Sequence, residues 1–480
     1  MMSRSGDPGR RDNSFFARRY VMSTGTPSGQ PSSGQPSHGQ TFSHRRALRA
    51  GMASFVGTSI EFYDFYIFAT AAALVFGPLF FPEAAPITGV LYSFATYAIG
   101  FFFRPLGGII FGHVGDRFGR QRSLVMTLVL MGVATTAVGV LPTYESVGML
   151  APILLIVLRA LQGIAVGGEW GGAVLMSVEN APNRFKGLYG AFPQLGNPMG
   201  ALLASGVFAL LTINGSDFLY DGGWRIPFLL SAVLIAVGFW VRYRVEETPV
   251  FTTEIEQDTK AELPVKAALK RNWKLILLGV GLIPISTGGY YMVTTFATAY
   301  GTEPAFGIGI SENQMLTILS VAAFGELVSC LIIGWLSDKI GRKRAMGGGL
   351  VVTAALVVPM FLTMSPDNVG LMFVLFTAVR IGMNFAWAPM ASILAQMFPP
   401  HSRQTSLSIS YSIGAAIWGG LAPVSATALY QATDTIWSGI FLYFAMTAIS
   451  ILCLALAPQR TDEVFEEDVL AARAAREANQ

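Results

Sequence analysis

Two segments of the chain share one pattern: Gly112-His-Val-Gly-Asp116-Arg117-Phe-Gly119-Arg120-Gln-Arg122 and Gly334-Trp-Leu-Ser-Asp338-Lys339-Ile-Gly341-Arg342-Lys-Arg344. Gly, Asp, Gly, Arg and Arg recur at the same internal spacing, offset by 222 residues (334 minus 112). Glycine permits a tight reversal of the chain, an aspartate can cap a helix, and arginines favour the membrane–water interface. One such turn occurs in many membrane proteins, but two at matching places predict a chain of two similar halves.

Apolar stretches flank both copies of this turn and recur along the whole chain. Of the 480 residues, 52% are hydrophobic and only 13% are charged, whereas roughly a quarter of the residues in a soluble domain are charged. A helix needs about 20 apolar residues to cross a bilayer. We therefore predict an all-α integral membrane protein with twelve transmembrane helices. They are expected at 50–76, 88–111, 122–141, 150–175, 187–211, 224–241, 275–299, 314–337, 344–363, 370–395, 405–429 and 436–457.

Among the loops between these spans, lysine and arginine occur only in alternate ones. The loops without either residue are 77–87, 142–149, 212–223, 300–313, 364–369 and 430–435. The other loops carry bases such as Arg117, Arg184, Lys339 and Arg403. Because basic loops stay in the cytoplasm, we expect a multi-pass protein of the cytoplasmic (inner) membrane, embedded in the lipid bilayer, with both termini cytoplasmic.

The segments outside the spans set the expected domain boundaries. Residues 23–40 are rich in Ser, Gly, Pro and Gln and repeat SGQPS, so 1–45 are expected to form a disordered cytoplasmic tail. Met22 opens this stretch and is a candidate for the true translation start in place of Met1. The expected order then continues with a six-helix bundle at 46–241, a cytoplasmic linker at 242–274, a second bundle at 275–457 and a cytoplasmic C-terminal tail at 458–480.

Several segments resemble a known family. The duplicated turn resembles the loop signature of the major facilitator superfamily, and Arg159-Ala-Leu-Gln162-Gly163 resembles the motif of its fourth helix. Other segments are similar to the metabolite:proton symporter family, which includes permeases for shikimate, α-ketoglutarate, citrate and proline/betaine. They are Gly57-Thr-Ser-Ile-Glu61-Phe-Tyr-Asp64-Phe-Tyr66, Arg104-Pro105-Leu-Gly-Gly108, Gly167-Gly-Glu169-Trp170-Gly-Gly172, Trp224-Arg225-Ile-Pro227-Phe228, Glu246-Glu-Thr-Pro249-Val-Phe251 and Gly419-Gly-Leu-Ala-Pro423. The resemblance implies the major facilitator fold, which consists of two pseudo-symmetric six-helix bundles with the substrate site between them.

Ionisable residues inside an apolar span are costly in lipid, so each one is a candidate for function. Glu61 and Asp64 are three residues apart in the first span and therefore share a helical face. Arg159 lies in the fourth span. With the family resemblance, this pattern favours a proton-coupling cluster of Glu61, Asp64 and Arg159. The alternative is a structural charge network that holds the first and fourth spans together.

Arg159 and Arg380 stand 221 residues apart, at equivalent places in the two halves. A guanidinium is a planar fork suited to a carboxylate, so a facing pair favours an organic anion as substrate. The alternative is that either arginine only neutralises Glu169 or Glu326. Polar side chains near these arginines or on the fifth and seventh spans complete the expected substrate site. The whole set is Arg159, Gln162, Gln194, Asn197, Tyr291, Arg380, Asn384 and Trp387.

The two copies of the basic turn also suggest a gate. Glu179 ends the fourth span on the same side of the membrane as the first copy. Charged groups at this rim would stabilise one conformation of the transporter without touching the substrate. The expected gating residues are Gly112, Asp116, Arg117, Arg120, Glu179, Asp338 and Arg342.

These observations predict a secondary active transporter that takes up a small metabolite together with protons by alternating access. A shikimate-like or dicarboxylate-like acid is the expected substrate, and a sodium-coupled variant stays open. One alternative is a zwitterion symporter of the proline/betaine type. A second is a drug-efflux protein or uncoupled facilitator, against which the acidic pair and the family segments argue.

An enzyme or a primary pump is the third alternative, and the sequence argues against it. It contains neither a GxxxxGK[ST] phosphate loop nor an HExxH metal-binding helix. Cys330 and Cys453 are separate residues in apolar runs, which offers no disulfide framework or zinc site. We therefore expect no cofactor and no metal. A net charge of +3 with dispersed bases gives no reason to expect a nucleic-acid partner, and we expect a functional monomer.

Overall fold

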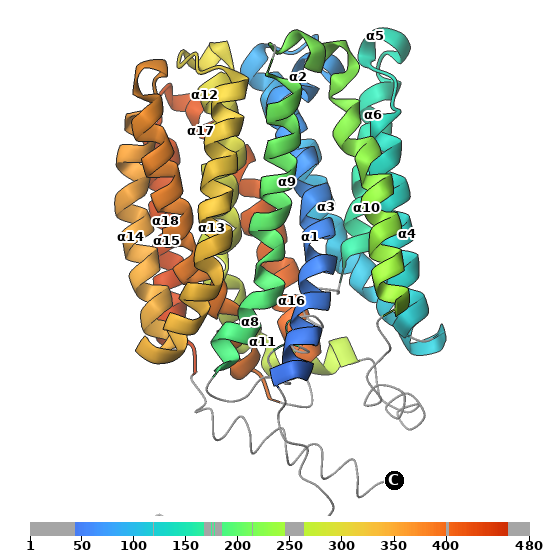
Figure 1. Ribbon diagram of the computed structural model, residues 1–480, viewed down its shortest axis with the longest axis vertical. Helices are drawn as coiled ribbons and strands as arrows, with labels where there is room; N and C mark the ends of the chain where they lie inside the picture. Colours follow the sequence, from blue (N-terminus) through green and yellow to red (C-terminus); the bar gives the residue numbers. More distant parts are fainter. Residues whose placement is uncertain are drawn as a thin grey trace, which may run out of the picture. The chain divides into compact units, whose positions relative to one another are not determined.

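The computed structural model describes residues 44–118, 120–167, 174, 177, 185–213, 215–244, 264–399 and 403–458. Its regular secondary structure is helical throughout these ranges. Each of the twelve predicted spans contains helix. The long helices run side by side, and shorter helical segments join them or interrupt them (Figure 1).

Six predicted spans make up the first half of the described chain. They correspond to α1 (His44–Leu74), α3 (Pro86–Phe118), α4 (Arg120–Gly139), α6 (Leu150–Val166), the pair α8 (Lys186–Gln194) and α9 (Gly196–Leu211), and α10 (Arg225–Arg244). Shorter segments are α2 (Phe76–Phe80), α5 (Tyr144–Val147) and the π-helical η2 (Leu219–Gly223). The fifth span therefore consists of two helices in sequence.

The second half contains the other six spans. The seventh comprises α11 (Pro264–Leu282), the π-helical η3 (Ile285–Gly289) and η4 (Met292–Phe296), and α12 (Ala297–Thr302). The eighth to tenth are α13 (Glu312–Ile340), α14 (Arg342–Leu362) and α15 (Val369–Met397). The eleventh joins α16 (Arg403–Gly414), the π-helical η8 (Ala415–Gly420) and α17 (Leu421–Thr433), and the twelfth is α18 (Trp437–Leu456). The 3-10 turns η5 (Pro304–Phe306) and η6 (Pro366–Asn368) lie between spans. Helix α11 begins inside the stretch 242–274 that the sequence assigns to a linker.

Length and hydropathy agree with a membrane-spanning bundle. Nine helical stretches within the described ranges are long and apolar enough to cross a membrane, and they cover the second span and the fifth to twelfth. The third and fourth spans contain the shorter apolar helices Met126–Gly139 and Leu150–Val166. The first span is α1, whose apolar character is lowered by Glu61 and Asp64.

Helices of the two halves meet along a defined set of elements. Helix α9 lies between α1 of its own half and α13 of the other half (Figure 1). Helix α8 packs on α13 and α15, α3 packs on η8 and α17, and α1 packs on α12 and η4. We call the end of the bundle that carries Gly334–Arg344 the motif end, and the opposite end, where α13 starts at Glu312, the far end.

Small residues let α3 and α6 approach closely. A Cβ atom added at Gly163 would collide with the backbone carbonyl of Gly100, so both helices need glycine at this crossing. A Cβ atom at Gly100 would in turn lie 2.6 Å from Nε of Arg159. The same close contact therefore makes room for a guanidinium group beside α3.

The seventh and eleventh spans depart from regular α-helix at the interface between the halves. Segments η3 and η4 flank Tyr290 and Tyr291, and η3 packs against η8. π-helical turns inside α-helices occur frequently at functional sites. In this protein they bring two consecutive tyrosines to the face that meets α1 and α3.

Candidate substrate and proton site

Asp64 is buried inside the first half, between α1, α4 and α10. The Ser231 hydroxyl donates a hydrogen bond to its Oδ1 (2.5 Å), and the Thr135 hydroxyl lies 3.2 Å from its Oδ2. Only 1% of the side-chain surface is exposed. Charged groups buried to this extent are normally paired or neutralised, so two neutral hydroxyls make an unusual setting for a carboxyl group.

Arg159 is linked to Asp64 through two intervening side chains. Gln162 Nε2 donates to the Thr135 hydroxyl oxygen (2.9 Å), and Arg159 Nη1 donates to Gln162 Oε1 (3.1 Å). Arg159 Nε also donates to the Tyr97 carbonyl oxygen (3.1 Å). Asp64 and Arg159, two of the three residues of the predicted cluster, are therefore connected by a chain of hydrogen bonds through Thr135 and Gln162.

Arg159 is surrounded by aromatic rings. Its Cζ lies 4.6 Å from the ring centre of Phe65, 4.4 Å from that of Phe68 and 4.6 Å from that of Tyr97. Its Nη2 is buried and has no hydrogen-bond partner among the described residues. An unpaired N–H of a buried guanidinium is costly, so this atom is a candidate to bind an acceptor from a ligand.

Glu61 occupies a different setting from Asp64 although both lie on α1. Its side chain is only partly buried, whereas Asp64 is fully buried. The two residues stand three positions apart and therefore share a face of α1. The structure therefore places both acids of the predicted pair in one region and places Asp64 deeper in the bundle.

Arg380 is paired within the second half. Its guanidinium forms a buried ion pair with the Glu326 carboxylate and donates from Nη2 to the Tyr290 hydroxyl (2.6 Å). The Arg380 Cζ also lies 4.5 Å from the centre of the Tyr290 ring. Of the two alternatives that the sequence allows for Arg380, neutralisation of Glu326 is the one seen in this conformation.

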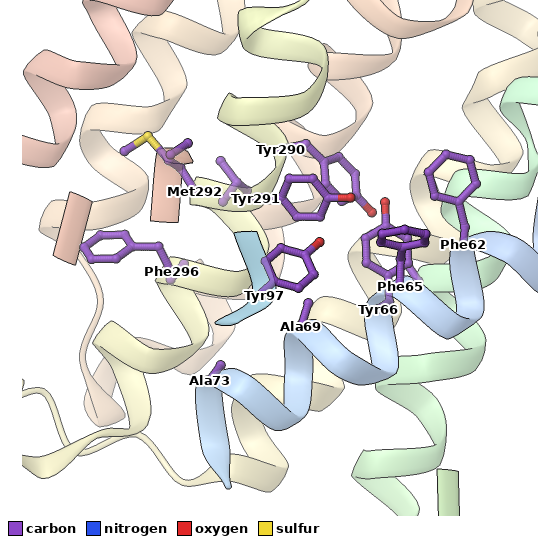
Figure 2. Close-up of a cluster of buried hydrophobic side chains, with 14 of the residues drawn as sticks. Phe62, Phe65, Tyr66, Ala69, Ala73, Tyr97, Tyr290, Tyr291, Met292 and Phe296 are labelled. Carbon is purple, nitrogen blue, oxygen red and sulfur yellow. The ribbon is translucent and has the colours of Figure 1, made fainter. Parts of the chain in front are cut away.

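Aromatic side chains fill the space between the Arg159 and Arg380 clusters. Figure 2 shows Tyr66 of α1 and Tyr97 of α3 facing Tyr290 and Tyr291 of the seventh span. Ring centres are 5.5 Å apart for Tyr66 and Tyr290 and 5.5 Å apart for Tyr97 and Tyr291. The two arginines therefore do not form one facing pair, because each contacts its own set of residues and tyrosines lie between those sets.

Gln194 and Trp387 join the halves directly. Gln194 Nε2 donates to the Trp387 carbonyl oxygen (3.0 Å), and Trp387 Nε1 donates to the Gln194 carbonyl oxygen (3.1 Å). The Trp387 ring also meets the Phe62 ring edge-on at 6.3 Å. Both predicted residues therefore lie at the interface between the halves, and they contact each other.

Asn197 and Asn384 complete the predicted set. Asn384 Nδ2 donates to the Glu326 carbonyl oxygen (2.6 Å) and to the Ser329 hydroxyl oxygen (2.8 Å), which ties α15 to α13. The Oδ1 atoms of both asparagines are buried without a hydrogen-bond partner in the described part of the chain. All the predicted substrate residues are buried, so this conformation shields the site from solvent.

The second copy of the duplicated turn contacts the first half. Gly341, with a φ of 96°, separates α13 from α14, and Arg342 Nη2 donates to Asp338 Oδ1 (2.8 Å). Asp338 also accepts hydrogen bonds from the backbone N–H groups of Gly187 (2.9 Å) and Leu188 (3.1 Å). These two groups lie in the first turn of α8, where N–H groups have no partner within the helix and favour a negative charge.

The other predicted gating side chains lie outside the described residues. They are Gly112, Asp116, Arg117, Arg120 and Glu179. The backbone of α3 ends at Phe118 and that of α4 begins at Arg120. These bounds match the end of α13 at Ile340 and the start of α14 at Arg342.

The halves also touch at the far end. The Tyr220 hydroxyl donates to Glu312 Oε1 (2.8 Å) and lies 3.1 Å from the Leu74 carbonyl oxygen. Asn313 Nδ2 donates to the Ala209 carbonyl oxygen (2.9 Å). Contacts between the halves are thus present at both ends, above and below the buried polar residues.

Sequence reasoning assigned no site role to several residues that the structure places here. The unpredicted contacts come from Tyr66, Tyr97, Arg104, Thr135 and Ser231. Arg104 gave a usable signal, since it is a charged residue inside the predicted span 88–111. Thr135 and Ser231 gave a weaker one, because single hydroxyls in apolar helices often bond only to the preceding turn.

Comparisons with known proteins agree with this architecture. The sequence profile of the family "Sugar (and other) transporter" matches residues 50–275, and that of the Major Facilitator Superfamily matches residues 285–476. A solved structure of the xylose transporter XylE from E. coli, in a partially occluded inward-open conformation, superposes with a TM-score of 0.64. It covers 86% of this chain and 98% of that chain at 17% identity, which is a likeness of fold.

Two curated relatives share more of the sequence. The inner membrane metabolite transport protein YhjE of Escherichia coli K12 is 36% identical over 412 residues, which cover 84% of this chain and 92% of that protein. The shikimate transporter of the same organism is 37% identical over 426 residues, which cover 85% of this chain and 95% of that protein. The predicted all-α fold of twelve transmembrane helices is confirmed. The chain belongs to the major facilitator superfamily and is a multi-pass membrane transporter related to metabolite permeases, not an enzyme.

Proposed function

We propose that this protein is a symporter that takes up a small organic carboxylate together with protons by alternating access. The observation that carries the proposal is the hydrogen-bonded chain from Asp64 through Thr135 and Gln162 to Arg159. A titratable carboxyl lies at one end of this chain and an incompletely paired guanidinium lies at the other. Protonation of Asp64 and occupation of Arg159 can therefore influence each other through the two side chains between them.

The conformation supports an occluded intermediate of such a cycle. Asp338 and the Gln194–Trp387 pair hold the halves together at and near the motif end, while Tyr220 and Glu312 connect them at the far end. Alternating access needs one set of contacts to break while the other persists. We infer that these residues belong to the two gates.

The orientation and the working unit are part of the proposal. The bases of the alternate loops support a cytoplasmic motif end and cytoplasmic termini. We propose in addition that the monomer is the functional unit of transport, since both gates and the buried site are formed within one chain. Labelling of cysteines introduced one at a time at Ser365 and Ser311 by an impermeant maleimide on intact cells tests the orientation. Both positions are expected to react from outside.

A zwitterion of the betaine type is a second candidate because of the tyrosines that lie between Arg159 and Arg380. Tyr66, Tyr97, Tyr290 and Tyr291 pack against one another in one cluster of aromatic rings (Figure 2). Aromatic rings bind quaternary ammonium groups through cation–π attraction. Such a substrate would place its carboxylate at Arg159 and its cation among the tyrosines.

Transport by purified protein in proteoliposomes tests the function. We expect a proton gradient, acidic outside, to drive accumulation of a radiolabelled carboxylate from a panel containing shikimate, α-ketoglutarate, citrate, proline and glycine betaine. A protonophore should abolish accumulation and leave exchange of internal for external substrate intact. Equal accumulation without the gradient, or gradient-independent uptake of lipophilic drugs instead, would refute the symport proposal.

A further inference from the structure

Arg104 of α3 is a second buried arginine of the first half. Its side chain is 5% exposed, and its Cζ lies 4.3 Å from the ring centre of Phe65 and 4.7 Å from that of Phe101. The Nε atom is buried and has no hydrogen-bond partner within the described ranges. Arginine stays charged in proteins and has five N–H donors, so a buried one without a carboxylate lacks the partner that normally stabilises it.

Arg159 packs against the same group of aromatic rings as Arg104. The Phe65 ring is shared, because the Arg159 Cζ lies 4.6 Å from its centre. In the described part of the chain neither guanidinium forms an ion pair with a carboxylate. Two positively charged guanidiniums therefore pack around one ring, and the buried carboxyl of Asp64 reaches Arg159 only through Thr135 and Gln162.

Other aromatic side chains surround these rings, and one of them, Tyr291, belongs to the other half. Tyr291 packs against Tyr97 with ring centres 5.5 Å apart and against Phe101 at 5.6 Å. A Cβ atom added at Gly419 of η8 would lie 3.2 Å from the Tyr291 ring and 3.3 Å from the Phe101 ring. The second half therefore covers these rings with a tyrosine and a glycine-containing segment, and separation of the halves would expose them.

We propose that Arg104 and Arg159 together bind the carboxylate group of the transported substrate, with Phe65, Phe101 and Tyr97 against its body and Tyr291 closing over it. This inference rests on the proposed function and adds Arg104 as a substrate-binding residue. Charge-assisted hydrogen bonds from two guanidiniums satisfy the unpaired N–H groups and neutralise the charge. These aromatic side chains favour a substrate with a compact ring, or a carboxylate with alkyl groups, over a substrate with a long polar chain.

The test measures binding to the purified full-length protein by isothermal titration calorimetry. Wild type, Arg104→Gln and Arg104→Lys are titrated with shikimate and with glycine betaine, and each is compared with the corresponding methyl ester, which lacks the negative charge. Arg271→Gln is the matched control, because Arg271 is an exposed arginine of α11.

Wild type is expected to bind at least one of the carboxylates and to prefer it over its ester. Arg104→Gln should raise the Kd of that carboxylate by roughly tenfold to a hundredfold, as for loss of one charge-assisted pair, and should reduce the preference over the ester by a similar factor. The Kd measured for Arg104→Lys should lie between those of wild type and Arg104→Gln. The Kd for Arg271→Gln should match that of wild type.

Three results separate the outcomes. Unchanged affinity and unchanged ester discrimination in both Arg104 variants would overturn the role of Arg104 while leaving the proposed function intact. Failure of wild type to bind any carboxylate of the transport panel, when all five are titrated, would overturn both. If Arg104→Gln does not yield folded protein by size-exclusion chromatography, Arg104→Lys is measured in its place. A preference of that variant for the carboxylate over the ester equal to that of wild type would also contradict the proposal.

Discussion

Gln194 and Trp387 connect the two halves of the transporter through reciprocal hydrogen bonds, in which each side chain donates to the backbone carbonyl of the other residue. Both residues are buried, and the bonds measure 3.0 and 3.1 Å. Because the two residues belong to different halves, the pair must separate when the halves move apart. It is therefore a natural point at which to perturb the conformational equilibrium.

Trp387→Phe should weaken the closed arrangement at this point. Phenylalanine keeps an aromatic ring beside Phe62 but removes the Nε1–H donor, and a buried carbonyl left without its partner costs about 1–3 kcal/mol. Cys330 reports the change, because its thiol is fully buried against Ala191 at the same interface. Alkylation of Cys330 by N-ethylmaleimide, in a Cys453→Ala background, should become faster. Trp273→Phe, at an exposed tryptophan, should label at the wild-type rate, and an identical rate in Trp387→Phe would contradict the gating role.

Asp338→Asn should open the motif end. The aspartate accepts bonds from Gly187 and Leu188 at the start of α8 and pairs with Arg342, and asparagine keeps the shape without the charge. Loss of charge–dipole and ion-pair contacts of this kind costs about 1–2 kcal/mol, so Cys330 alkylation should accelerate several-fold. Asp367→Asn, which removes a carboxylate from an exposed turn, serves as the control. Slower labelling in Asp338→Asn would reverse the proposed role.

Glu326 and Arg380 should behave as a coupled pair in stability measurements. Removal of one partner from a buried ion pair costs about 3–5 kcal/mol, because the other charge stays buried without compensation. Glu326→Gln and Arg380→Met are each expected to lower the midpoint of thermal unfolding in detergent. The double variant should lose less stability than the sum of the two single variants. Strict additivity would show that the pair seen in the structure contributes no coupling.

Gly163→Ala should destabilise the first half. The added methyl group collides with the Gly100 carbonyl at the crossing of α3 and α6, and overpacking of this kind costs about 1–3 kcal/mol. Gly206→Ala is the matched control, since a Cβ atom at Gly206 meets no atom within 4 Å. Thermal unfolding should therefore shift downward for Gly163→Ala only. Equal midpoints for both variants would mean that the two helices do not need this close approach.

Local patterns in the sequence predicted most of the fold. Apolar stretches of sufficient length located the helices, and the glycine of the duplicated turn located the break between α13 and α14 at Gly341. The π-helical segments η3, η4 and η8 could not be predicted, because they depend on packing between the seventh and eleventh spans. The same applies to the division of the fifth span into α8 and α9.

For the candidate site, the sequence indicated which residues to consider but did not indicate their partners. Intramembrane charge identified Asp64, Arg159 and Arg380, but each interacts with groups far away in the sequence. Asp64 bonds to Ser231, and Arg380 pairs with Glu326. Such partners depend on how helices pack, which a single sequence without its three-dimensional arrangement does not specify. Arg104 shows the reverse case, because its charge was visible in the second span while the buried Nε without a hydrogen-bond partner required the structure.

Asp64→Asn tests the central claim most directly. The purified variant and wild type are reconstituted into liposomes and compared in two assays with the same radiolabelled carboxylate, namely accumulation driven by a proton gradient and exchange at equal pH on both sides. Asparagine keeps the hydrogen-bonding contacts with Ser231 and Thr135 possible but cannot take up or release a proton. We predict that the variant loses gradient-driven accumulation, retains exchange, and exchanges at a rate independent of pH. Accumulation at the wild-type level by Asp64→Asn would contradict the account.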